Sequence, residues 1–566
     1  MTRFHESLRQ PGRLALRLGI CGAAGVLLVT GGLWLRGQLA PTERPMSSLV
    51  PPGALVYLES PDFGSLLSRW NASAEKKAWI ASNNYSVLSR SRLLGRLQQA
   101  QGEFQTAAGV SPEMQLLTQL AGKESALAIY DLSNLKFVYV TRLPGNSLDA
   151  NALWQQRPKY ERRQVAGIDF FHHTDGGRTT AFASQKDYFV VATDLDLMAQ
   201  ALTLLAEQPG PALANEAWFR DVVASVTTNN PKPPLRLVYN MEQLVGTPQF
   251  RTYWIQQNVT EMKQYRAGIC DLYESENAFT EKRVLLRKTP AAQTTDDQAV
   301  SRLLAYTPAA RSFYQAWADP SEQRVRSMLA QTLTGETVAG LNETLYAPTV
   351  TSEANAIGTA SDLETRIDEP PATPRLLPTI DPVVDALMAL KPVAALQIQG
   401  TTETADRVFI VPQSTLVLQF AAADRDRVEG ALAPVVNALV FGGSSTWQRT
   451  PAATTFGAIE PLVVTEGGPS VFIISRGTSL VDSTGASRRP AAPAPLTYAA
   501  GYNHSLAFTP YRRLFGTIEP KEQSEPPFFG GNVGSLAASL PRLDSIRIRA
   551  LETQSTLTEE VLYQLK

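Results

Sequence analysis

The chain has few of the residues that build redox, metal and nucleic-acid sites. Only two of its 566 residues are cysteines and four are histidines. Cys21 lies in an apolar N-terminal segment, so Cys270 has no disulfide partner in the remainder of the chain. The formal net charge is −1, and no long basic run stands outside the N-terminal flank. These scarcities disfavour a disulfide scaffold and a nucleic-acid partner.

Motifs of the common enzyme classes are also missing. The sequence contains no Gly-x-Ser-x-Gly nucleophile elbow, zinc-protease motif or dinucleotide fingerprint. Ser73-Ala74-Glu75-Lys76 has the Ser-x-x-Lys spacing of some serine hydrolases but lacks the companion Ser-Asp-Asn and Lys-Thr-Gly motifs, so a solvated helix face is the better interpretation. Gly530 to Gly534 lacks the lysine and hydroxyl of a phosphate loop and predicts a turn. We therefore expect no cofactor and favour a non-enzymatic protein without excluding an enzyme.

One uncharged apolar run, Leu18 to Leu35, is long enough to span a membrane as a helix of about 27 Å. The flank before it is rich in arginine, which by the positive-inside rule places the N-terminus in the cytoplasm and exports the rest. The residues Gln38-Leu39-Ala40 make a poor cleavage site, which favours a retained anchor over a removed signal peptide. The sequence thus predicts a single-pass protein with the membrane as one partner.

The remaining sequence repeats itself, and its composition, 44% apolar and 19% charged, is that of a globular protein. A Tyr-Asn pair followed by a Thr-Pro pair occurs at Tyr239 to Pro248 and again at Tyr502 to Pro510. The two copies also end alike. Four residues near the end of the first copy recur in the second copy at one constant offset: Glu274 as Glu552, Thr280 as Thr558, Glu281 as Glu559 and Lys288 as Lys566. This pattern indicates an internal duplication.

Each copy combines helical and β-type patterns. Asp169 to His173 and Thr179 to Ser184 flank Asp175-Gly176-Gly177 and predict a hairpin, because glycine tolerates the positive φ of a tight turn. Ser60-Pro61-Asp62 predicts a helix start with a capping serine, and Asp319 is the expected cap in the second copy. The predicted fold class is α+β: an N-terminal transmembrane helix followed by two tandem, similar units with mainly antiparallel sheets.

The predicted boundaries follow from these patterns and from polar linkers. They are a cytoplasmic tail (1–17), a transmembrane helix (18–35), a stalk (36–48), a first repeat unit (49–289), a linker (290–299) and a second repeat unit (300–566) with an insertion near 348–379.

His172, His173 and Asp175 form the densest group of potential metal ligands or catalytic side chains. Adjacent residues of a strand point to opposite faces, however, so an exposed hairpin tip is the favoured interpretation and no metal site is predicted. Cys270 lies in a β-type pattern and predicts a core or edge thiol. The first copy is rich in aromatic residues, which we expect mostly in the core, although some could line a groove between the copies. They are Trp70, Trp79, Tyr85, Trp154, Trp218, Tyr253 and Trp254.

The segment Val50 to Phe63, the segment Leu127 to Arg142 and the repeated Tyr-Asn and Thr-Pro pairs together resemble a known family. It consists of bacterial membrane-anchored proteins of unknown function with a duplicated α+β exported region. The resemblance implies a location on the bacterial inner membrane with the C-terminal bulk exported, and it supplies no catalytic residues.

Three functions remain open at this point. The first is a non-enzymatic envelope protein that binds another protein or a polymer near the membrane. The second is an envelope hydrolase with a site near His172, His173 and Asp175. The third is a carrier of apolar ligands, which would need a cavity rather than two filled cores. The sequence leaves the oligomeric state open.

Overall fold

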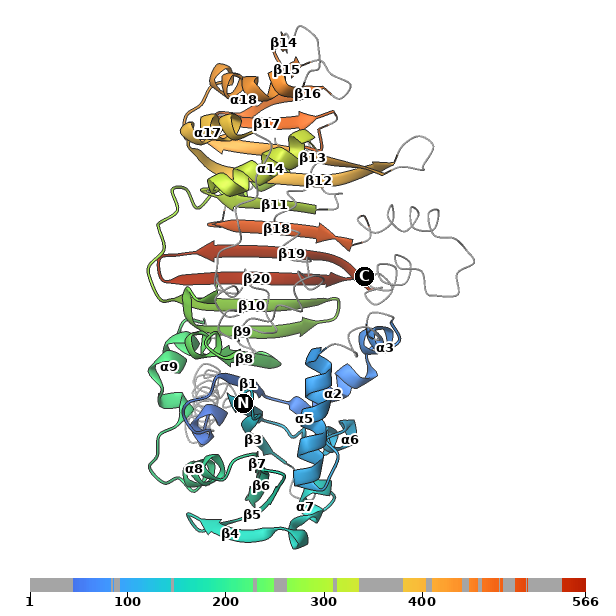
Figure 1. Cartoon of the computed structure of the whole chain (residues 1–566), viewed down its shortest axis with the longest axis vertical. Helices are drawn as coiled ribbons and strands as arrows, with labels where there is room; N and C mark the ends of the chain where they lie inside the picture. The colour runs from blue at the N-terminus through green and yellow to red at the C-terminus, as the bar shows by residue number, and fades with distance from the viewer. Residues whose placement is uncertain are drawn as a thin grey trace, which may run out of the picture.

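The computed structural model describes residues 44–82, 85, 92–143, 147–226, 232–248, 262–308, 313–334, 380–403, 410–439, 447–456, 461–477, 479–481, 494–504, 506 and 542–566. All twenty strands in these ranges belong to one sheet, and every pairing between them is antiparallel. Figure 1 shows the sheet running the length of the molecule as two stacked halves.

The N-terminal half of the sheet has the order β4-β5-β6-β7-β3-β2-β1-β8-β9-β10. Its strands are β1 (Val56–Ser60), β2 (Ser125–Asp131), β3 (Lys136–Arg142), β4 (Glu161–Val165), β5 (Ile168–Asp175), β6 (Arg178–Gln185), β7 (Tyr188–Ala192), β8 (Leu235–Tyr239), β9 (Tyr265–Ser275) and β10 (Ala278–Arg287).

The C-terminal half has the corresponding order β14-β15-β16-β17-β13-β12-β11-β18-β19-β20. Its strands are β11 (Phe313–Ala318), β12 (Pro392–Glu403), β13 (Ile410–Phe420), β14 (Trp447–Arg449), β15 (Ala453–Phe456), β16 (Leu462–Gly468), β17 (Val471–Arg476), β18 (Tyr498–Asn503), β19 (Leu543–Glu552) and β20 (Thr556–Leu565). Each half therefore uses ten strands in the same spatial sequence.

The halves join where β10 pairs with β20. At the centre of this seam Lys282 faces Glu560, and the offset that relates Glu281 to Glu559 also relates these two residues. The two copies thus meet through equivalent strands about a pseudo-twofold axis. Arg283 Nη1 donates to Glu559 Oε2 at 3.0 Å across the seam, and Arg287 pairs with Glu552 beside it.

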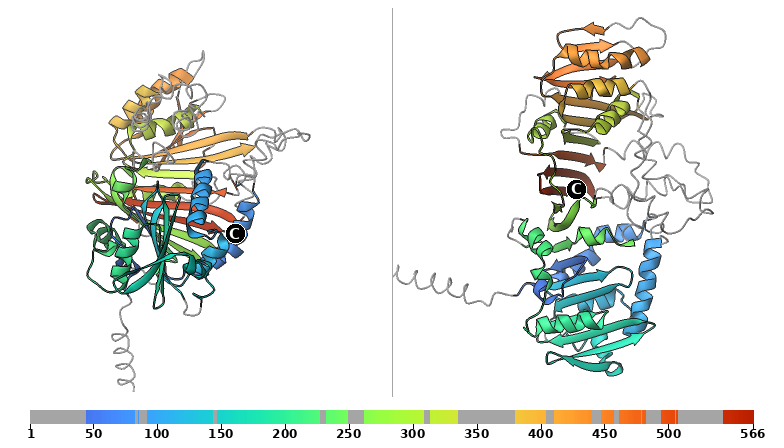
Figure 2. Two further views of the ribbon diagram at one scale, coloured as in Figure 1. Left: turned by 60° about the horizontal axis from the view of Figure 1, so that its bottom comes forward. Right: turned by 60° about the vertical axis from the view of Figure 1, so that its left-hand side comes forward.

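Helices cover both faces of the N-terminal half, and Figure 2 shows α5 standing beside this part of the sheet. The first face carries α2 (Phe63–Ala72), α3 (Ala74–Ile80), α5 (Arg92–Ala108), α6 (Met114–Leu120) and α7 (Ala152–Gln155). The opposite face carries η1 (Met46–Leu49), α8 (Leu195–Leu205), η3 (Leu213–Asn215) and α9 (Ala217–Ala224). Short η2 (Arg157–Lys159) and α10 (Met241–Leu244) complete this half.

In the C-terminal half, α14 (Glu322–Thr334), α17 (Asp381–Ala389) and α18 (Arg425–Leu439) cover one face, and α13 (Ala299–Leu303) with η4 (Leu304–Tyr306) packs on the other.

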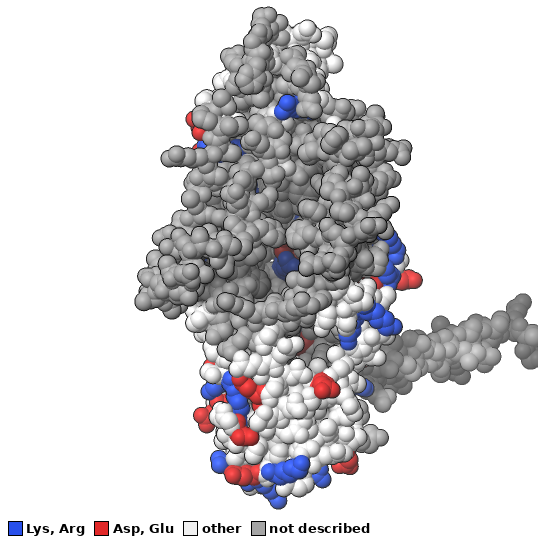
Figure 3. Space-filling view, turned by 45° about the vertical axis from the view of Figure 1, so that its right-hand side comes forward, with Lys and Arg blue, Asp and Glu red and all other residues white. Residues whose placement is uncertain are grey.

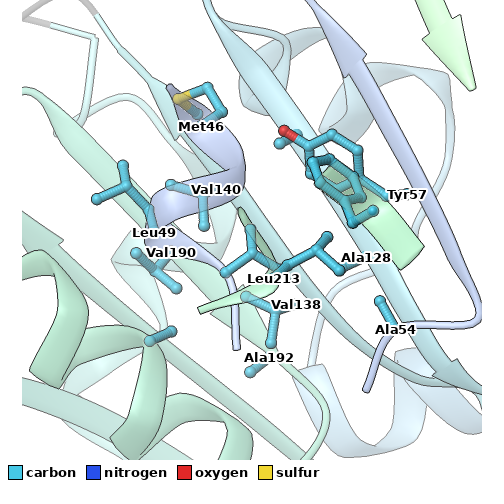
Figure 4. Packing of buried hydrophobic residues seen from close by; sticks show 14 of the residues in the cluster. Met46, Leu49, Ala54, Tyr57, Ala128, Val138, Val140, Val190, Ala192 and Leu213 are labelled. Carbon is cyan, nitrogen blue, oxygen red and sulfur yellow. The ribbon is translucent and has the colours of Figure 1, made fainter. Parts of the chain in front are cut away.

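The main core of the N-terminal half lies on the η1, α8 and α9 side of the sheet. Strand alternation sends Tyr57, Ala128, Val138 and Val140 into it, where they meet Leu213 (Figure 4). Tyr57 is fully buried, and its hydroxyl donates to Glu59 Oε2 at 2.8 Å. The residues of opposite parity on the same strands must then face α2, α5 and α6, where the candidate site lies.

The predicted fold class, a transmembrane helix followed by two units with their own sheets, is wrong. In the described ranges no helix is both long enough and apolar enough to cross a membrane, and Leu18 to Leu35 lies outside those ranges. The sheets are continuous because the last strand of one half pairs with the last strand of the other. Strand patterns within each copy do not reveal a pairing between copies. The predicted insertion (348–379) also lies outside the described residues.

Two predicted helix caps are also wrong. Ser60 ends β1 and donates its hydroxyl to Pro234 O at 2.7 Å, while Asp62 caps α2 by accepting from Ser65 N at 2.9 Å. This bond holds the pKa of the Asp62 carboxyl below its usual value. In the second copy Ser321, rather than Asp319, accepts from Arg324 N. Asp319 has a positive φ of 40°. Its carboxylate accepts a hydrogen bond from Thr295 N at 2.7 Å and so contacts the segment that precedes α13.

Candidate functional site

An apolar groove lies between α2, α5 and α6 and the face of the sheet that they cover. Its volume of about 470 Å³ falls in the usual range of ligand pockets. Its wall is almost entirely apolar, with few polar atoms exposed to the interior. The groove is lined by Leu58, Glu59, Ser60, Phe63, Ala100, Gln101, Phe104, Pro112, Leu116, Leu117, Leu120, Ser125, Ala126, Leu127, Ile129, Leu135, Phe137, Tyr139, Val191 and Leu235.

The floor of the groove follows from strand alternation. Tyr57, Ala128 and Val138 point into the opposite core, so Leu58, Leu127 and Phe137 take the groove side. These groove-side residues stay half-buried, whereas the core-side residues are fully buried. The sheet therefore presents an apolar surface that the helices above it cover only in part.

The roof is formed by helices that pack loosely. None of the described side chains of α2 is buried, and Trp70 is 49% exposed, although the sequence predicted it for the core. On α6, Leu116 and Leu120 pack inward while Met114 and Leu117 are 40% and 39% exposed. Figure 3 turns this side toward the viewer, and the middle of the described surface carries few charged side chains. Leu117 thus exposes apolar surface in the wall of the groove, and Met114 and Trp70 expose more on the same helices.

The hydroxyl groups that line the groove make hydrogen bonds within the protein. Tyr139 donates to Leu120 O at 2.8 Å, and Ser125 Oγ lies 2.7 Å from Thr141 Oγ1. Burial raises the pKa of the Tyr139 phenol, so it stays protonated at physiological pH. Satisfied groups of this kind supply no nucleophile or base.

A second, polar cavity of about 460 Å³ adjoins the groove. The two cavities share four lining residues: Ala100, Phe104, Leu135 and Phe137. The remaining walls of the polar cavity come from Glu103 and Ala107 on α5, from the turn between β2 and β3, from the hairpin between β5 and β6, and from the start of α8. The polar cavity therefore continues the groove at one end.

Four of the five charged residues that line the polar cavity form two ion pairs. Arg178 Nη2 lies 2.6 Å from Glu103 Oε2, and Lys136 Nζ donates to Asp194 Oδ2 at 2.7 Å. Burial acts to raise the pKa of Asp194, but the hydrogen bonds from Lys136 and from backbone N–H groups at the start of α8 outweigh it and lower the pKa. The bond to Asp194 raises the pKa of Lys136. Both side chains are therefore ionised at neutral pH.

The hairpin residues proposed as catalytic or metal ligands do not converge. His172 is 5% exposed, whereas His173 and Asp175 are exposed. His173 faces Tyr160, with ring centroids 5.5 Å apart, on the other side of the sheet from His172. Within the described ranges, no three histidine, cysteine or acidic side chains gather closely enough to hold a metal ion.

Burial lowers the pKa of His172, so its ring is neutral at physiological pH. Its Nε2 lies 3.3 Å from Glu161 Oε2, but neither ring nitrogen makes a hydrogen bond within the described structure. A neutral ring makes this a contact rather than an ion pair. His504 directly follows β18 in the other half of the sheet.

The other sequence candidates have structural roles or cannot be placed. Ser73 caps α3 by accepting from Lys76 N at 3.1 Å, and Lys76 Nζ donates to Asn71, so this Ser-x-x-Lys motif is a helix start. Cys270 is half-buried within β9, and burial raises the pKa of its thiol, which suppresses the reactive thiolate. Gly530 to Gly534 lies outside the described residues.

Sequence reasoning missed the groove itself. It considered a groove between the copies, whereas the cavity lies within the first copy. The same leucines and phenylalanines build a filled core or a cavity wall, so residue type carries no signal here.

Comparisons with known proteins add little. No family model and no curated protein matches the chain. Among solved structures, crystal form I of TP0453 aligns with 46% of this chain and 86% of its own, at 14% identity and a TM-score of 0.25. Crystal form III of TP0453 aligns with 46% and 88%, at 15% identity and the same TM-score. These similarities are too weak to carry an argument about fold or function.

Proposed function

We propose that the protein is a non-enzymatic binding protein whose N-terminal half holds the hydrocarbon chain of a lipid-like ligand in the apolar groove. One observation carries the proposal: a cavity of about 470 Å³ with an almost wholly apolar wall, roofed by helices that leave apolar side chains exposed. A hydrocarbon chain that enters the groove removes its own surface and that of the wall from water, which favours binding by about 25 cal/mol per Å².

Of the three functions left open by the sequence, this proposal is the carrier of apolar ligands, and we favour it over the envelope hydrolase. In the described part of the chain the two hairpin histidines lie on opposite faces of the sheet, and the hydroxyls of the groove are engaged in internal hydrogen bonds. Neither arrangement provides a nucleophile with an adjacent base. Binding of a protein or polymer in the cell envelope remains a second proposal, to which the exposed side chains of Trp70, Met114 and Leu117 would contribute.

The test is a titration of the full chain with the neutral fluorescent probe N-phenylnaphthylamine. Detergent must be absent, because detergents are themselves single-chain amphiphiles. The substitution Ala100→Trp places an indole at the junction of the two cavities, and we expect it to weaken probe binding at least about tenfold by occupying the space. Gln105→Trp adds the same side chain to α5 at an exposed position away from both cavities.

Gln105→Trp should therefore bind the probe as the unmodified chain does. Equal loss in both variants, or no saturable binding by the unmodified chain, would overturn the proposal. Circular dichroism of both variants establishes that the fold is retained.

A further inference from the structure

The polar cavity beside the groove is placed to receive the other end of the same ligand. Phe104 and Phe137 line both cavities, so a chain lying in the groove has its end within reach of the polar walls. The polar cavity is lined by three threonines, two lysine or arginine side chains and three acidic side chains. This composition suits a polar head group better than a second hydrocarbon chain.

The charges in this cavity do not favour an ionised head group. Arg178 is already paired with Glu103 and also donates to Asn134 O at 2.5 Å, and Lys136 is paired with Asp194. Asp196 adds an exposed carboxylate at the same wall. A carboxylate or phosphate would have to displace an internal acidic partner and approach the remaining negative charge, which costs free energy. The hydrogen-bonding capacity of the cavity is better matched by uncharged groups.

One buried hydroxyl in this wall lacks a partner. Thr180 is fully buried, and its Oγ1 makes no hydrogen bond within the described structure. Its neighbour Ala181 points into the α8 core, and Phe182 packs on the α5 side, so strand alternation turns Thr180 toward α5 and the polar cavity. An unpaired buried hydroxyl is costly, and a ligand hydroxyl that bonds to it removes that cost. Because Thr180 is fully buried in this structure, the side chains that cover it must shift before a ligand can reach its Oγ1.

We propose that the ligand is a single-chain amphiphile with an uncharged, hydroxyl-bearing head group, of the monoacylglycerol class, whose head lies in the polar cavity and bonds to Thr180. This inference rests on the proposed function, since the hydrocarbon chain must occupy the groove. It extends that function by naming the chemistry of the head group. Fatty acids, lysophospholipids and fully apolar esters are the alternatives that the test separates.

The experiment measures displacement of N-phenylnaphthylamine from the full chain by monopalmitoylglycerol, by palmitate and by methyl palmitate, which share one hydrocarbon chain. We expect monopalmitoylglycerol to displace the probe at about fivefold lower concentration than either of the others, the effect of about one net hydrogen bond. Lysophosphatidylglycerol, which adds a phosphate charge to a similar head, should bind more weakly than monopalmitoylglycerol.

The variant Thr180→Val keeps the shape of the side chain and removes the hydroxyl. We expect it to raise the melting temperature of the free protein, because no unpaired group is then buried, while it weakens monopalmitoylglycerol about fivefold and leaves methyl palmitate unchanged. Thr174→Val, at an exposed position of the same hairpin that lines neither cavity, serves as the control. A merely structural role of Thr180 would change all ligands together.

The two proposals fail differently. If the unmodified chain binds the probe and all three palmitoyl compounds equally, the groove binds hydrocarbon and the head-group inference is wrong. Tighter binding of palmitate or lysophosphatidylglycerol than of monopalmitoylglycerol also overturns the inference by showing an anionic head. Failure to bind the probe at all defeats the proposed function itself.

Discussion

The two halves of the sheet share one strand order but differ in how one face is packed. This is the face covered by the helices that follow β1 in the N-terminal half and β11 in the C-terminal half. In the C-terminal half, α14, α17 and α18 fill this face: Leu329, Leu333, Val384 and Leu387 are fully buried against the sheet. In the N-terminal half, the helices between β1 and β2 leave the groove, and no described side chain of α2 is buried. One architecture thus supports a filled core in one copy and a cavity in the other.

The difference shows how a duplicated fold can separate stability from binding. The filled half can supply packing free energy for the whole sheet, because the seam between β10 and β20 ties the halves together. The hollow half can then tolerate exposed apolar wall, which a small independent domain could hardly afford. This is why we assign binding to the N-terminal half, and the following predictions test the contrast from the largest expected effect to the smallest.

The buried acid of the filled half should matter most. Glu429 on α18 is 4% exposed and accepts from Arg425 Nε at 3.1 Å and from Arg449 Nε at 2.8 Å. Glu429→Ala leaves buried polar partners unpaired and should lower the free energy of unfolding by about 3–5 kcal/mol. Glu103→Ala on α5 breaks a pair whose side chains are each 31% exposed and should cost about 1 kcal/mol or less. Urea unfolding of both variants measures the contrast, and equal losses would contradict it.

Leucine truncation should show the same asymmetry. Leu416 on β13 is fully buried in the filled core, so Leu416→Ala creates a closed cavity and should cost about 2–5 kcal/mol. Leu127 on β2 lines the groove and is only half-buried, so Leu127→Ala merely widens an existing space and should cost about 1 kcal/mol. The measurement is again the urea midpoint. A larger loss at Leu127 would mean that the groove is closed in solution.

The smallest effect concerns acid stability at the polar cavity. Asp194 caps α8, accepting from Asp196 N at 3.0 Å and Leu197 N at 3.2 Å, and its folded-state pKa is lowered. A carboxyl with a depressed folded-state pKa contributes stability above its unfolded pKa of about 3.9, and this contribution is lost as the pH falls through the folded value. Asp194→Asn should therefore cost about 1 kcal/mol at neutral pH and reduce the slope of stability against pH below about 4. An unchanged slope would show that the cap and the pair with Lys136 do not form.

Several elements of this fold could be predicted because their cause is local. The hairpin around Gly176 and Gly177 is confirmed: β5 and β6 pair through Asp175 and Arg178, and both glycines have positive φ. The end of α5 at Gly109 follows the same logic, with a φ of 62°.

The features that failed or were missed depend on distant contacts. Whether Ser60 or Asp62 caps α2 is decided by the bond from Ser60 to Pro234 O, far along the chain. The continuous sheet depends on a pairing between copies, and the groove depends on how far α5 stands from β2 and β3. The spacing of apolar residues along the sequence does not indicate the distance between a helix and the sheet that it covers. The two hairpin histidines do not form a site because adjacent residues of a strand point to opposite faces of the sheet, which the sequence alone already indicated.

The position of the seam also constrains how the protein can be made. The outer edge of β10, complete at Arg287, can find its partner β20 only after residues up to Leu565 have left the ribosome. During all of that synthesis a newly folded N-terminal half would present an unpaired ten-residue edge strand to its surroundings. Such edges pair readily with strands of other chains. Glu281, Lys282 and Arg283 lie at the middle of this edge, and charged side chains there oppose pairing with strands of other chains. In the native seam Lys282 and Arg283 face Glu560 and Glu559.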